Sequence, residues 1–514
     1  MKLFSWCRNS AGRLPLLDSE SQEFAPNSLG YEQNPMIKAS GFREYDARWL
    51  FEKEINLAGV QVVGLSLGTM IRERGIPPRI VVGHDYRSYS SAIKYALTSG
   101  LMAAGCEVHD IGMCTTPMAY FAQFDLDIQC VAMVTASHNE NGWTGIKMGL
   151  KRPLTFGPDD INDLKQKAMK GGWHSSSGGG LVLVSNFYDR YRSNLTAGKA
   201  LSRKLRVAVV CGNGTAGAFA PQILRDIGCE VVEIDCTLDF NFPNYNPNPE
   251  DMVMLNVMRE AVKTHRLDLA FGFDGDSDRC GVVDNEGQVI FADKLGLMLA
   301  RDIAVQIPHA KFVVDVKSTG LFKTDPILLQ HRASVDYWKT GHSYIKQRTT
   351  ELQAVAGFEK SGHFFFCPPF GHGYDDGIVS AIAVCHMLDR TPHLTLAEMY
   401  RNLPLSYSTP SMSPHCDDDK KYGVLERLTK KIREDAAAGM HIAGGAISEI
   451  NTINGVRFGF PDSSWGLVRA SSNKPELVVV CESLKSEQQM RNIFAYIRSL
   501  LDHEPDVGAF NQMI

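Results

Sequence analysis

The chain has 514 residues, a length that suggests three or four domains. Hydrophobic residues make up 44% of the sequence and charged residues 22%, which is typical of a globular protein with a core of ordinary size. The formal net charge is −5. This balance does not favour a nucleic acid as partner, because binding a polyanion usually requires a basic face. The net charge does not exclude a small anionic substrate, because binding of such a substrate depends on the local charge of its site.

The twelve cysteines form no Cys-x-x-Cys pair and no zinc-type spacing. Free, buried thiols in a reducing compartment explain this pattern best. No apolar run reaches the ~20 residues of a membrane span, and the N-terminus lacks the apolar core and cleavage site of a signal peptide. We therefore expect a cytoplasmic protein that does not associate with a membrane.

The elements predicted along the chain form an internal repeat. Residues 1–35 are polar and aperiodic and predict a flexible extension. The first copy of the repeat comprises a strand at 80–83, a helix from about 88 to 104 and a strand from 106. The second copy comprises a strand at 207–210, a glycine turn at 212–214, a helix at 216–227 and a strand at 229–232. A weaker third copy begins at 312–315. This alternation indicates βαβ units and largely parallel sheets.

The C-terminal part of the chain has a different pattern. A polar stretch at 406–421 predicts a linker. After it come a charged helix at about 420–437, hairpin strands at 456–460 and 465–470, a strand at 476–482 and a helix at 487–501. This order predicts an α+β domain. The expected boundaries are 1–35 for the extension and 36–195, 196–295, 296–405 and 406–514 for four domains.

A serine-containing turn follows the apolar strand at 131–134. The turn reads Thr135-Ala136-Ser137-His138-Asn139. A serine at the end of a strand can be exposed as a nucleophile, but Ser137 can equally cap a turn or a following helix. No Gly-x-Ser-x-Gly elbow is present, so the sequence does not suggest an ordinary acyl-transfer hydrolase.

An acidic turn follows the apolar strand at 267–273. Asp274, Asp276 and Asp278 alternate with small residues on this turn. Unpaired carboxylates at this spacing would repel one another, and a hard divalent cation would remove that cost. The alternative is a solvated turn with Asx hydrogen bonds. The later spacing of an EF-hand is missing, so the pattern favours Mg²⁺ that bridges a phosphate.

Two further loops carry polar groups. The stretch Gly357–His363 places a carboxylate and a hydroxyl where they can bind sugar hydroxyls, although an ordinary turn explains it as well. The stretch Arg469–Pro475 offers an arginine, two serines, an amide and backbone N–H groups that suit a phosphate, or else forms a polar hairpin turn. Lys317 and His342 also fall in predicted loops of the third segment.

Each of the four segments carries one of these loops, and their order resembles that of the α-D-phosphohexomutase superfamily, most closely its bacterial phosphomannomutase/phosphoglucomutase branch. The resemblance runs from about Gly41 to about Leu501. It implies three related α/β domains with mixed sheets and a C-terminal α+β domain around a central cleft.

The resemblance also implies roles for individual residues. Ser137 would be the phosphorylated serine, and Asp274, Asp276 and Asp278 would bind one Mg²⁺ with Ser137 as a further ligand. The other residues at catalytic positions are His138, Lys147, Arg48, His342 and Arg279. The residues at substrate-binding positions are Tyr45, Lys317, Glu359, Ser361, His363, Arg469, Ser471, Ser472 and Asn473.

The function implied by the resemblance is reversible transfer of a phosphoryl group between C1 and C6 of mannose or glucose phosphates, through a phosphoserine and a 1,6-bisphosphate. Hexose 1,6-bisphosphate would act as activator, a hexose phosphate would be the substrate, and the chain would be a monomer or weak homodimer. The candidates for the general base are Lys147, His342 and Arg48, in that order.

Phosphoglucosamine mutase is the nearest alternative within this superfamily. A phosphatase and a non-catalytic sugar-phosphate sensor are alternatives from other functional classes. The sequence departs from the common family pattern at Glu140, at Thr144-Gly145 and at Lys360. Lys360 occupies a specificity position, so it leaves the preferred sugar open.

Overall fold

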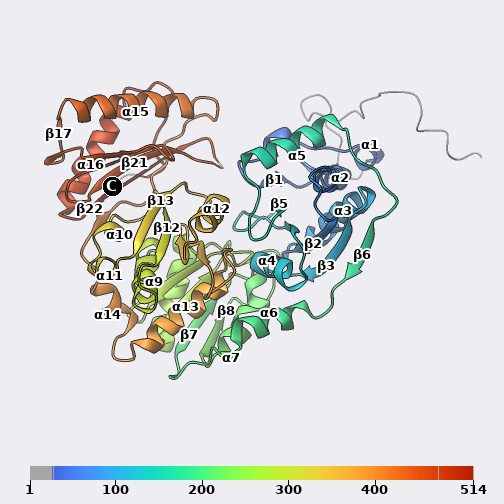
Figure 1. Ribbon diagram of the computed structural model, residues 1–514, viewed down its shortest axis with the longest axis horizontal. Coiled ribbons are helices and arrows are strands. Elements are labelled where there is room, and N and C mark those ends of the chain that lie inside the picture. The colour runs from blue at the N-terminus through green and yellow to red at the C-terminus, as the bar shows by residue number, and fades with distance from the viewer. Residues whose placement is uncertain (1–25, 27, 473, 513–514) are drawn as a thin grey trace, which may run out of the picture. The chain divides into compact units, whose positions relative to one another are not determined.

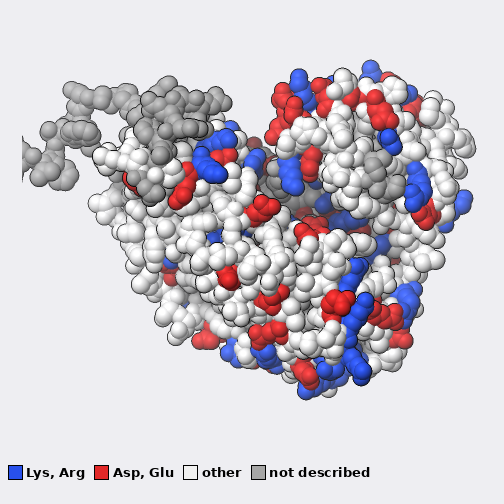
Figure 2. All heavy atoms as spheres, turned by 180° about the vertical axis from the view of Figure 1, so that it is seen from behind, with Lys and Arg blue, Asp and Glu red and all other residues white. Residues whose placement is uncertain are grey.

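The computed structural model describes residues 26, 28–472 and 474–512 (Figure 1). The chain divides into two compact units. The first contains the described residues up to Cys114 together with Ala119–Phe187, and the second contains Thr115–Met118 and the chain from Tyr188 onward. No helix in the described part of the chain is long and apolar enough to cross a membrane. Figure 2 shows Lys and Arg interspersed with Asp and Glu on one face of the molecule.

The first unit is built on a six-stranded mixed sheet with the order β1-β5-β4-β2-β3-β6. Its strands are β1 (Ala47–Leu50), β2 (Arg79–His84), β3 (Glu107–Met113), β4 (Cys130–Val134), β5 (Trp143–Gly149) and β6 (Gly180–Leu183). Its helices are α1 (Leu29–Gln33), η1 (Ala39–Gly41), α2 (Leu57–Glu73), α3 (Ser90–Ala103), α5 (Pro158–Lys170) and most of α4 (Thr116–Asp125). Strands β4, β2, β3 and β6 are parallel, and β5 is antiparallel to both of its neighbours, β1 and β4.

Helices α2 and α3 pack closely because glycines lie where they meet. A Cβ atom on Gly64 would lie 2.2 Å from the carbonyl oxygen of Leu97, and one on Gly100 would lie 2.0 Å from that of Gln61. No other residue type leaves this space empty. Both helices also contribute buried apolar side chains to the core beneath the sheet, including Val63 and Leu97.

The second unit contains two more mixed sheets. One has the order β11-β10-β9-β7-β8 and the other has the order β13-β12-β14-β15. The strands of the first are β7 (Arg206–Val210), β8 (Glu230–Ile234), β9 (Leu269–Phe273), β10 (Cys280–Asp284) and β11 (Val289–Ile290). The strands of the second are β12 (Lys311–Asp315), β13 (Ser334–Trp338), β14 (Ala356–Phe358) and β15 (Phe364–Phe366). The helices are α6 (Phe187–Thr196), η2 (Thr215–Ala218), α7 (Ala220–Asp226), α8 (Met252–His265), α9 (Ala292–Gln306), α10 (Leu321–Thr324), α11 (Pro326–Gln330), α12 (His342–Leu352), α13 (Gly377–Arg390) and α14 (Leu396–Arg401).

The C-terminal part of the second unit is an antiparallel sheet with the order β16-β22-β21-β20-β19. Its strands are β16 (Tyr407–Ser408), β19 (Glu449–Asn451), β20 (Val456–Gly459), β21 (Trp465–Ala470) and β22 (Leu477–Ser483). Helices α15 (Lys421–Ala437) and α16 (Glu487–Leu501) pack against it, and β17 (His441–Ile442) pairs with β18 (Gly445–Ala446). The expected fold class, three α/β sheets followed by a C-terminal α+β domain, is therefore confirmed.

Three segments differ from the sequence-based expectation. The helix expected at 216–227 is interrupted, because η2 ends at Ala218 and α7 begins at Ala220. The stretch 406–421 is not a free linker: β16 pairs with β22, and Met412 and Cys416 are fully buried. Residues 29–33, expected to be flexible, form α1, while residues 1–25 and 27 lie outside the described part of the chain. The domain boundaries and the central cleft stay predictions.

A buried ion pair connects the third sheet's helix α9 with the C-terminal sheet. Lys294 Nζ lies 2.6 Å from Glu482 Oε1, and both side chains are almost completely buried. Glu482 also accepts hydrogen bonds from the Thr319 hydroxyl, the Gly320 N–H and the Trp465 indole. Burial opposes ionisation of Glu482, but Lys294 and these donors outweigh it and lower its pKa to about 2. The carboxylate is therefore charged and fully hydrogen-bonded.

Glu482→Gln should lower the free energy of unfolding near neutral pH by about 3 kcal/mol, because it leaves Lys294 buried without its counter-charge. The folded-state pKa lies below the ordinary value, so the stabilisation is present above about pH 4.5 and is lost as the pH falls toward 2. Denaturation followed across this range should show a shallower loss of stability in the variant. Glu449→Gln, which breaks an exposed pair with Lys323, is the matched control and should cost less than about 1 kcal/mol. Equal effects of the two substitutions would contradict the assignment.

Candidate functional site

The four loops singled out in the sequence have one structural feature in common. Each connects two adjacent antiparallel strands: β4 to β5, β9 to β10, β14 to β15 and β21 to β22. In the first three sheets the strand before the loop also pairs in parallel with a neighbour. Each loop is therefore held at the end of a buried strand, where polar groups can be presented without breaking the core.

The serine loop is tightly held within the first unit. Ser137 is 1% exposed and has a φ of +52°, which is uncommon for a residue other than glycine. Its N–H donates to Thr135 Oγ1 at 2.9 Å, and its Oγ lies 3.3 Å from His138 Nδ1. Strained backbone of this kind persists only where the surroundings impose it, and it occurs often at functional sites.

Arginine side chains hold the carbonyl groups of this loop. Arg48 donates to the Ala136 carbonyl and to Asn139 Oδ1. Arg87, which is almost fully buried, donates to the carbonyls of Ser137 and Asn139 at 3.0 and 2.6 Å. Sequence reasoning missed Arg87. The only signal is its place just after β2, the strand next to β4, and that neighbour relation is not visible in the sequence.

The remaining candidates in this unit lie on or near the same sheet. Lys147 lies on β5 opposite Met133 and is 3% exposed. Tyr45 is buried just before β1. The structure therefore assembles Arg48 and His138 around Ser137 and places Lys147 on the strand that follows the loop.

The aspartate loop in the second unit brings three carboxylates together. Asp274, Asp276 and Asp278 are fully buried, and one oxygen of each lies within 4.8 Å of the others. The turn is closed by the Ser277 N–H, which donates to the Asp274 carbonyl, and Ser277 has a φ of +64°. Three buried carboxylates at this distance repel one another strongly unless a cation lies among them.

Thr116 is a second-unit residue that sequence reasoning missed. Its hydroxyl donates to Asp276 Oδ2 at 2.6 Å and its N–H to the Asp276 carbonyl at 2.9 Å. Thr116 is fully buried, and the contact spans 160 positions of the chain. It fixes the orientation of the Asp276 carboxylate, a role that polar neighbours of metal ligands often have.

A histidine between two acids adjoins the aspartate loop. His363 Nδ1 lies 2.9 Å from Asp375 Oδ2 and 3.7 Å from Asp278 Oδ1, and its Nε2 accepts a hydrogen bond from Arg279 Nε. Asp375 is also 2.8 Å from Lys346 Nζ. Burial opposes ionisation of Asp375, but Lys346 and His363 outweigh it and hold its pKa well below the usual range. Asp375 thus has two basic partners, Lys346 and His363.

The loop between β14 and β15 presents Glu359 and Ser361. The Glu359 carboxylate accepts hydrogen bonds from the Gly341 N–H and from Ser361 Oγ. Burial raises its pKa. His342 begins helix α12 directly after Gly341, and its ring centre is 5.9 Å from that of His363. Lys317 Nζ lies 3.7 Å from Asp315 Oδ2 at the end of the neighbouring strand β12.

Arg469 lies on β21, one residue before the end of the strand that leads into the loop to β22, and is 5% exposed. Its guanidinium donates to Ser472 Oγ at 3.1 Å, while its Nε is buried and has no hydrogen-bond partner in the described part of the chain. Lys421 Nζ donates to the Ser471 carbonyl at 2.6 Å and forms an ion pair with Asp418. The predicted residue Asn473 lies outside the described residues.

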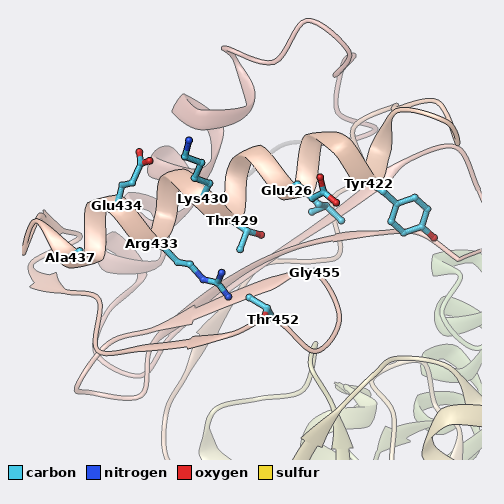
Figure 3. Close-up of a pocket in the computed structure, with 10 residues that line it drawn as sticks. Tyr422, Glu426, Thr429, Lys430, Arg433, Glu434, Ala437, Thr452 and Gly455 are labelled. Atoms are coloured by element: carbon cyan, nitrogen blue, oxygen red, sulfur yellow. The ribbon is translucent and has the colours of Figure 1, made fainter.

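The predicted residues therefore fall into two groups. The first unit holds Tyr45, Arg48, Ser137, His138 and Lys147, and the second unit holds the others that the structure describes. An open cavity of about 640 Å³ along helix α15, between Tyr422 and Ala437, belongs to neither group (Figure 3). None of the predicted site residues lines it.

Comparison with known proteins identifies three domains of the chain. Residues 39–174, 185–287 and 291–407 match α/β/α domains I, II and III of phosphoglucomutase/phosphomannomutase. The chain is 34% identical over 449 residues to phosphomannomutase/phosphoglucomutase of Pseudomonas syringae pv. tomato, covering 87% of this chain and 92% of the relative. It is 32% identical over 443 residues to phosphoglucomutase of Neisseria gonorrhoeae, covering 86% and 92%.

A solved structure of the same family is also similar to the chain. The crystal structure of a phosphoglucomutase/phosphomannomutase family protein from Burkholderia thailandensis aligns with a TM-score of 0.81 at 29% identity, covering 92% of this chain and all of that one. The chain is thus an α/β protein of the phosphohexomutase class. The members of this class are isomerases of carbohydrate metabolism. It belongs to the phosphoglucomutase/phosphomannomutase family of the α-D-phosphohexomutase superfamily.

Thr116→Val should weaken binding of a divalent cation to the aspartate loop about 10- to 100-fold, because it removes the hydroxyl that orients Asp276. Titration of the protein with Mn²⁺, followed by electron paramagnetic resonance, measures this without turnover.

Thr144→Val is the matched control. Thr144 is a buried threonine whose hydroxyl has no hydrogen-bond partner among the described residues, so its substitution should leave the Mn²⁺ affinity unchanged. If Thr116→Val and Thr144→Val bind Mn²⁺ equally well, Thr116 has no positioning role.

Proposed function

We propose that the chain transfers a phosphoryl group reversibly between C1 and C6 of mannose or glucose phosphates. The observation that supports this most is the presence of all four hairpin loops in one chain, each with a chemistry that the reaction needs. These are a serine hydroxyl, a carboxylate cluster, a carboxylate with a hydroxyl for the sugar, and an arginine-serine loop for a phosphate.

Ser137 is proposed to store the phosphoryl group. The P–O bond to Ser137 breaks as a hydroxyl oxygen of the hexose monophosphate bonds to phosphorus. The proton of that sugar hydroxyl passes to a base, and the Ser137 oxygen leaves with the electron pair of the broken bond and takes up a proton. The resulting 1,6-bisphosphate then reorients, so that its other phosphoryl group faces Ser137 and is transferred back to it. Added hexose 1,6-bisphosphate would therefore phosphorylate Ser137 and activate the enzyme.

The aspartate loop fits Mg²⁺ as its cofactor. Asp274, Asp276 and Asp278 offer only hard oxygen donors, lie close together and are fully buried. These three residues would hold the ion. When bound, Mg²⁺ offsets negative charge on the transferring group. Arg279 and His138 are proposed to add positive charge or hydrogen bonds to that group.

The base is proposed to be Lys147, ahead of His342 and Arg48. Arg48 is the weakest candidate, because a guanidinium does not lose its proton in proteins and this one already binds Asp46 and Asn139. Lys147 has a buried place on the strand that follows the serine loop.

The loops of the second unit are proposed to bind the sugar phosphate. Glu359 and Ser361, together with Lys317 and His363, would bind the sugar hydroxyls. Arg469, Ser471, Ser472 and Asn473 would bind the phosphate that does not react, and Tyr45 would contribute from the first unit. The buried, unsatisfied Nε of Arg469 supports this role, because a phosphate oxygen would complete its hydrogen bonding.

Ser137→Ala should lower kcat for conversion of glucose 1-phosphate to glucose 6-phosphate by more than about 10⁴-fold, as expected for loss of a nucleophile. Intact-mass and peptide analysis of the active protein should place one phosphate on Ser137. Ser99→Ala, on the exposed face of α3, is the control and should retain activity. Retained mutase activity in Ser137→Ala would exclude the mechanism, and steady release of inorganic phosphate would favour the phosphatase alternative.

Arg469→Ala should raise KM for the sugar phosphate about 10- to 100-fold with a smaller effect on kcat, because it removes a charged hydrogen-bond donor to the non-reacting phosphate. Steady-state kinetics with glucose 1-phosphate measure both constants. Arg427→Ala, which removes an exposed pair with Glu504, should leave KM unchanged. A KM for Arg469→Ala equal to that of the unaltered protein would argue against a phosphate-binding role.

Lys360 should disfavour glucosamine phosphate, because its ammonium group would repel the amino group of that sugar. The expected kcat/KM is at least about tenfold lower for glucosamine 1-phosphate than for mannose or glucose 1-phosphate. Lys360→Gln should reduce the difference in kcat/KM between glucosamine 1-phosphate and the other two sugar phosphates. A preference for glucosamine 1-phosphate would make the chain a phosphoglucosamine mutase, and no turnover of any of the three sugars would favour the sensor alternative.

A further inference from the structure

A hollow with two adjoining lobes lies beside helix α13 in the second unit. The lobes have volumes of about 200 and 260 Å³ and share the lining residues Lys199, Phe366, Pro369, Phe370 and Val379. Together they approach the size of small-molecule sites, roughly 300–1,000 Å³. None of the residues proposed for phosphoryl transfer lines either lobe.

The wall of the first lobe is mainly apolar, and polar and apolar groups share the wall of the second. Phe366 is buried beneath both lobes, and Phe370 lies partly exposed at their common edge. Leu299 and Ile382 line the first lobe, and Tyr374 lines the second. Such walls favour a ligand with an apolar body and disfavour a hydrated sugar.

Lys199 is a cation in this apolar setting. In the described part of the chain its Nζ has neither an ion pair nor a hydrogen bond, and burial lowers its pKa although the charge of Asp376 opposes that shift. The Asp376 carboxylate accepts hydrogen bonds from other groups, namely the N–H groups of Ile378 and Val379 and the Tyr191 hydroxyl. The Lys199 ammonium is therefore available to a bound anion.

The other basic groups of the hollow add hydrogen-bonding capacity but no free charge. Arg390 forms an ion pair with Asp302. Burial lowers the pKa values of His386 and His372, so both rings are neutral at pH 7. His386 Nε2 is buried and has no hydrogen-bond partner among the described residues. Lys199 is thus the basic group of the hollow without an ion pair in the described part of the chain, and the Asp376 carboxylate offsets only part of its charge. A ligand with a single negative charge matches this setting.

We propose that this hollow binds a small monoanion with an aromatic body, of the arene carboxylate class, with its carboxylate on Lys199 and its ring against Phe366 and Phe370. A hexose phosphate does not match, because it is doubly charged and polar on all sides. The site is therefore distinct from the substrate site, and its existence does not depend on the proposed mutase reaction.

The hollow is close to the aspartate loop through helix α13. Asp376 lines the second lobe and caps this helix, and the next residue, Gly377, donates its N–H to the Ser277 carbonyl at 3.0 Å. A ligand that shifts the first turn of α13 would therefore act on the loop that carries Asp276 and Asp278. This gives the site a short physical route to the proposed metal ligands.

Isothermal titration of the full chain with 1-naphthoate tests the proposal. We expect one molecule per chain, at least tenfold weaker binding of the uncharged 1-naphthamide, and no competition by inorganic phosphate. Lys199→Met should weaken 1-naphthoate binding at least tenfold. Lys204→Met, which removes an exposed lysine paired with Glu230, is the control and should bind as the unaltered protein does.

A second variant tests the apolar wall. Ala383→Leu fills part of the first lobe and should also weaken 1-naphthoate binding, and a melting temperature close to that of the unaltered protein shows that the fold is kept. Any of four results would overturn the proposal. These are no binding of 1-naphthoate, equal affinity for 1-naphthamide, displacement of 1-naphthoate by phosphate, and unchanged 1-naphthoate affinity in both Lys199→Met and Ala383→Leu. These binding measurements are independent of mutase activity.

Discussion

Mutual repulsion among Asp274, Asp276 and Asp278 is the constraint on which the second unit depends. Three carboxylates that are fully buried within 4.8 Å of one another are costly unless a cation lies among them. Their loop is accordingly held from several sides: by Thr116 at Asp276, by the N–H of Gly377 at the Ser277 carbonyl, and by the turn hydrogen bond within the loop. The chain maintains an arrangement that is unfavourable alone and becomes favourable with a divalent cation.

The hairpin connection explains how one chain can present four different chemistries. A strand that is buried on both sides fixes where its loop begins, and the returning antiparallel strand fixes where the loop ends. Aspartates at the ends of neighbouring parallel strands hold two of these loops: Asp85 accepts the Ala136 N–H, and Asp315 accepts the Lys360 N–H. The backbone is therefore rigid where the side chains vary, so each segment can carry a different functional group on the same framework.

For the serine and aspartate loops, the sequence predicted the strand that leads into the loop but not the strand that leaves it, β5 or β10. The apolar runs before Ser137 and Asp274 are short, continuous and recognisable, whereas β5 and β15 contain glycine or follow polar turns and were not expected as strands. The stretch 406–421 was expected to be a linker because it is polar, yet Met412 and Cys416 are buried in it. Composition averaged over such a stretch conceals single anchoring residues, and strand pairing depends on partners far away in the chain.

The sequence by itself determined the fold class, the family and the order of the four loops, because these depend on local patterning and on residue types at short spacing. Only the tertiary structure decided which distant groups hold the loops in place. Thr116 and Arg87 carry no local signal, since their partners lie 160 and about 50 positions away. The hollow around Lys199 also belongs to the tertiary structure, because its walls come from three separate parts of the chain. Side-chain burial and pairing across such separations result from tertiary packing, and a local sequence pattern does not predict them.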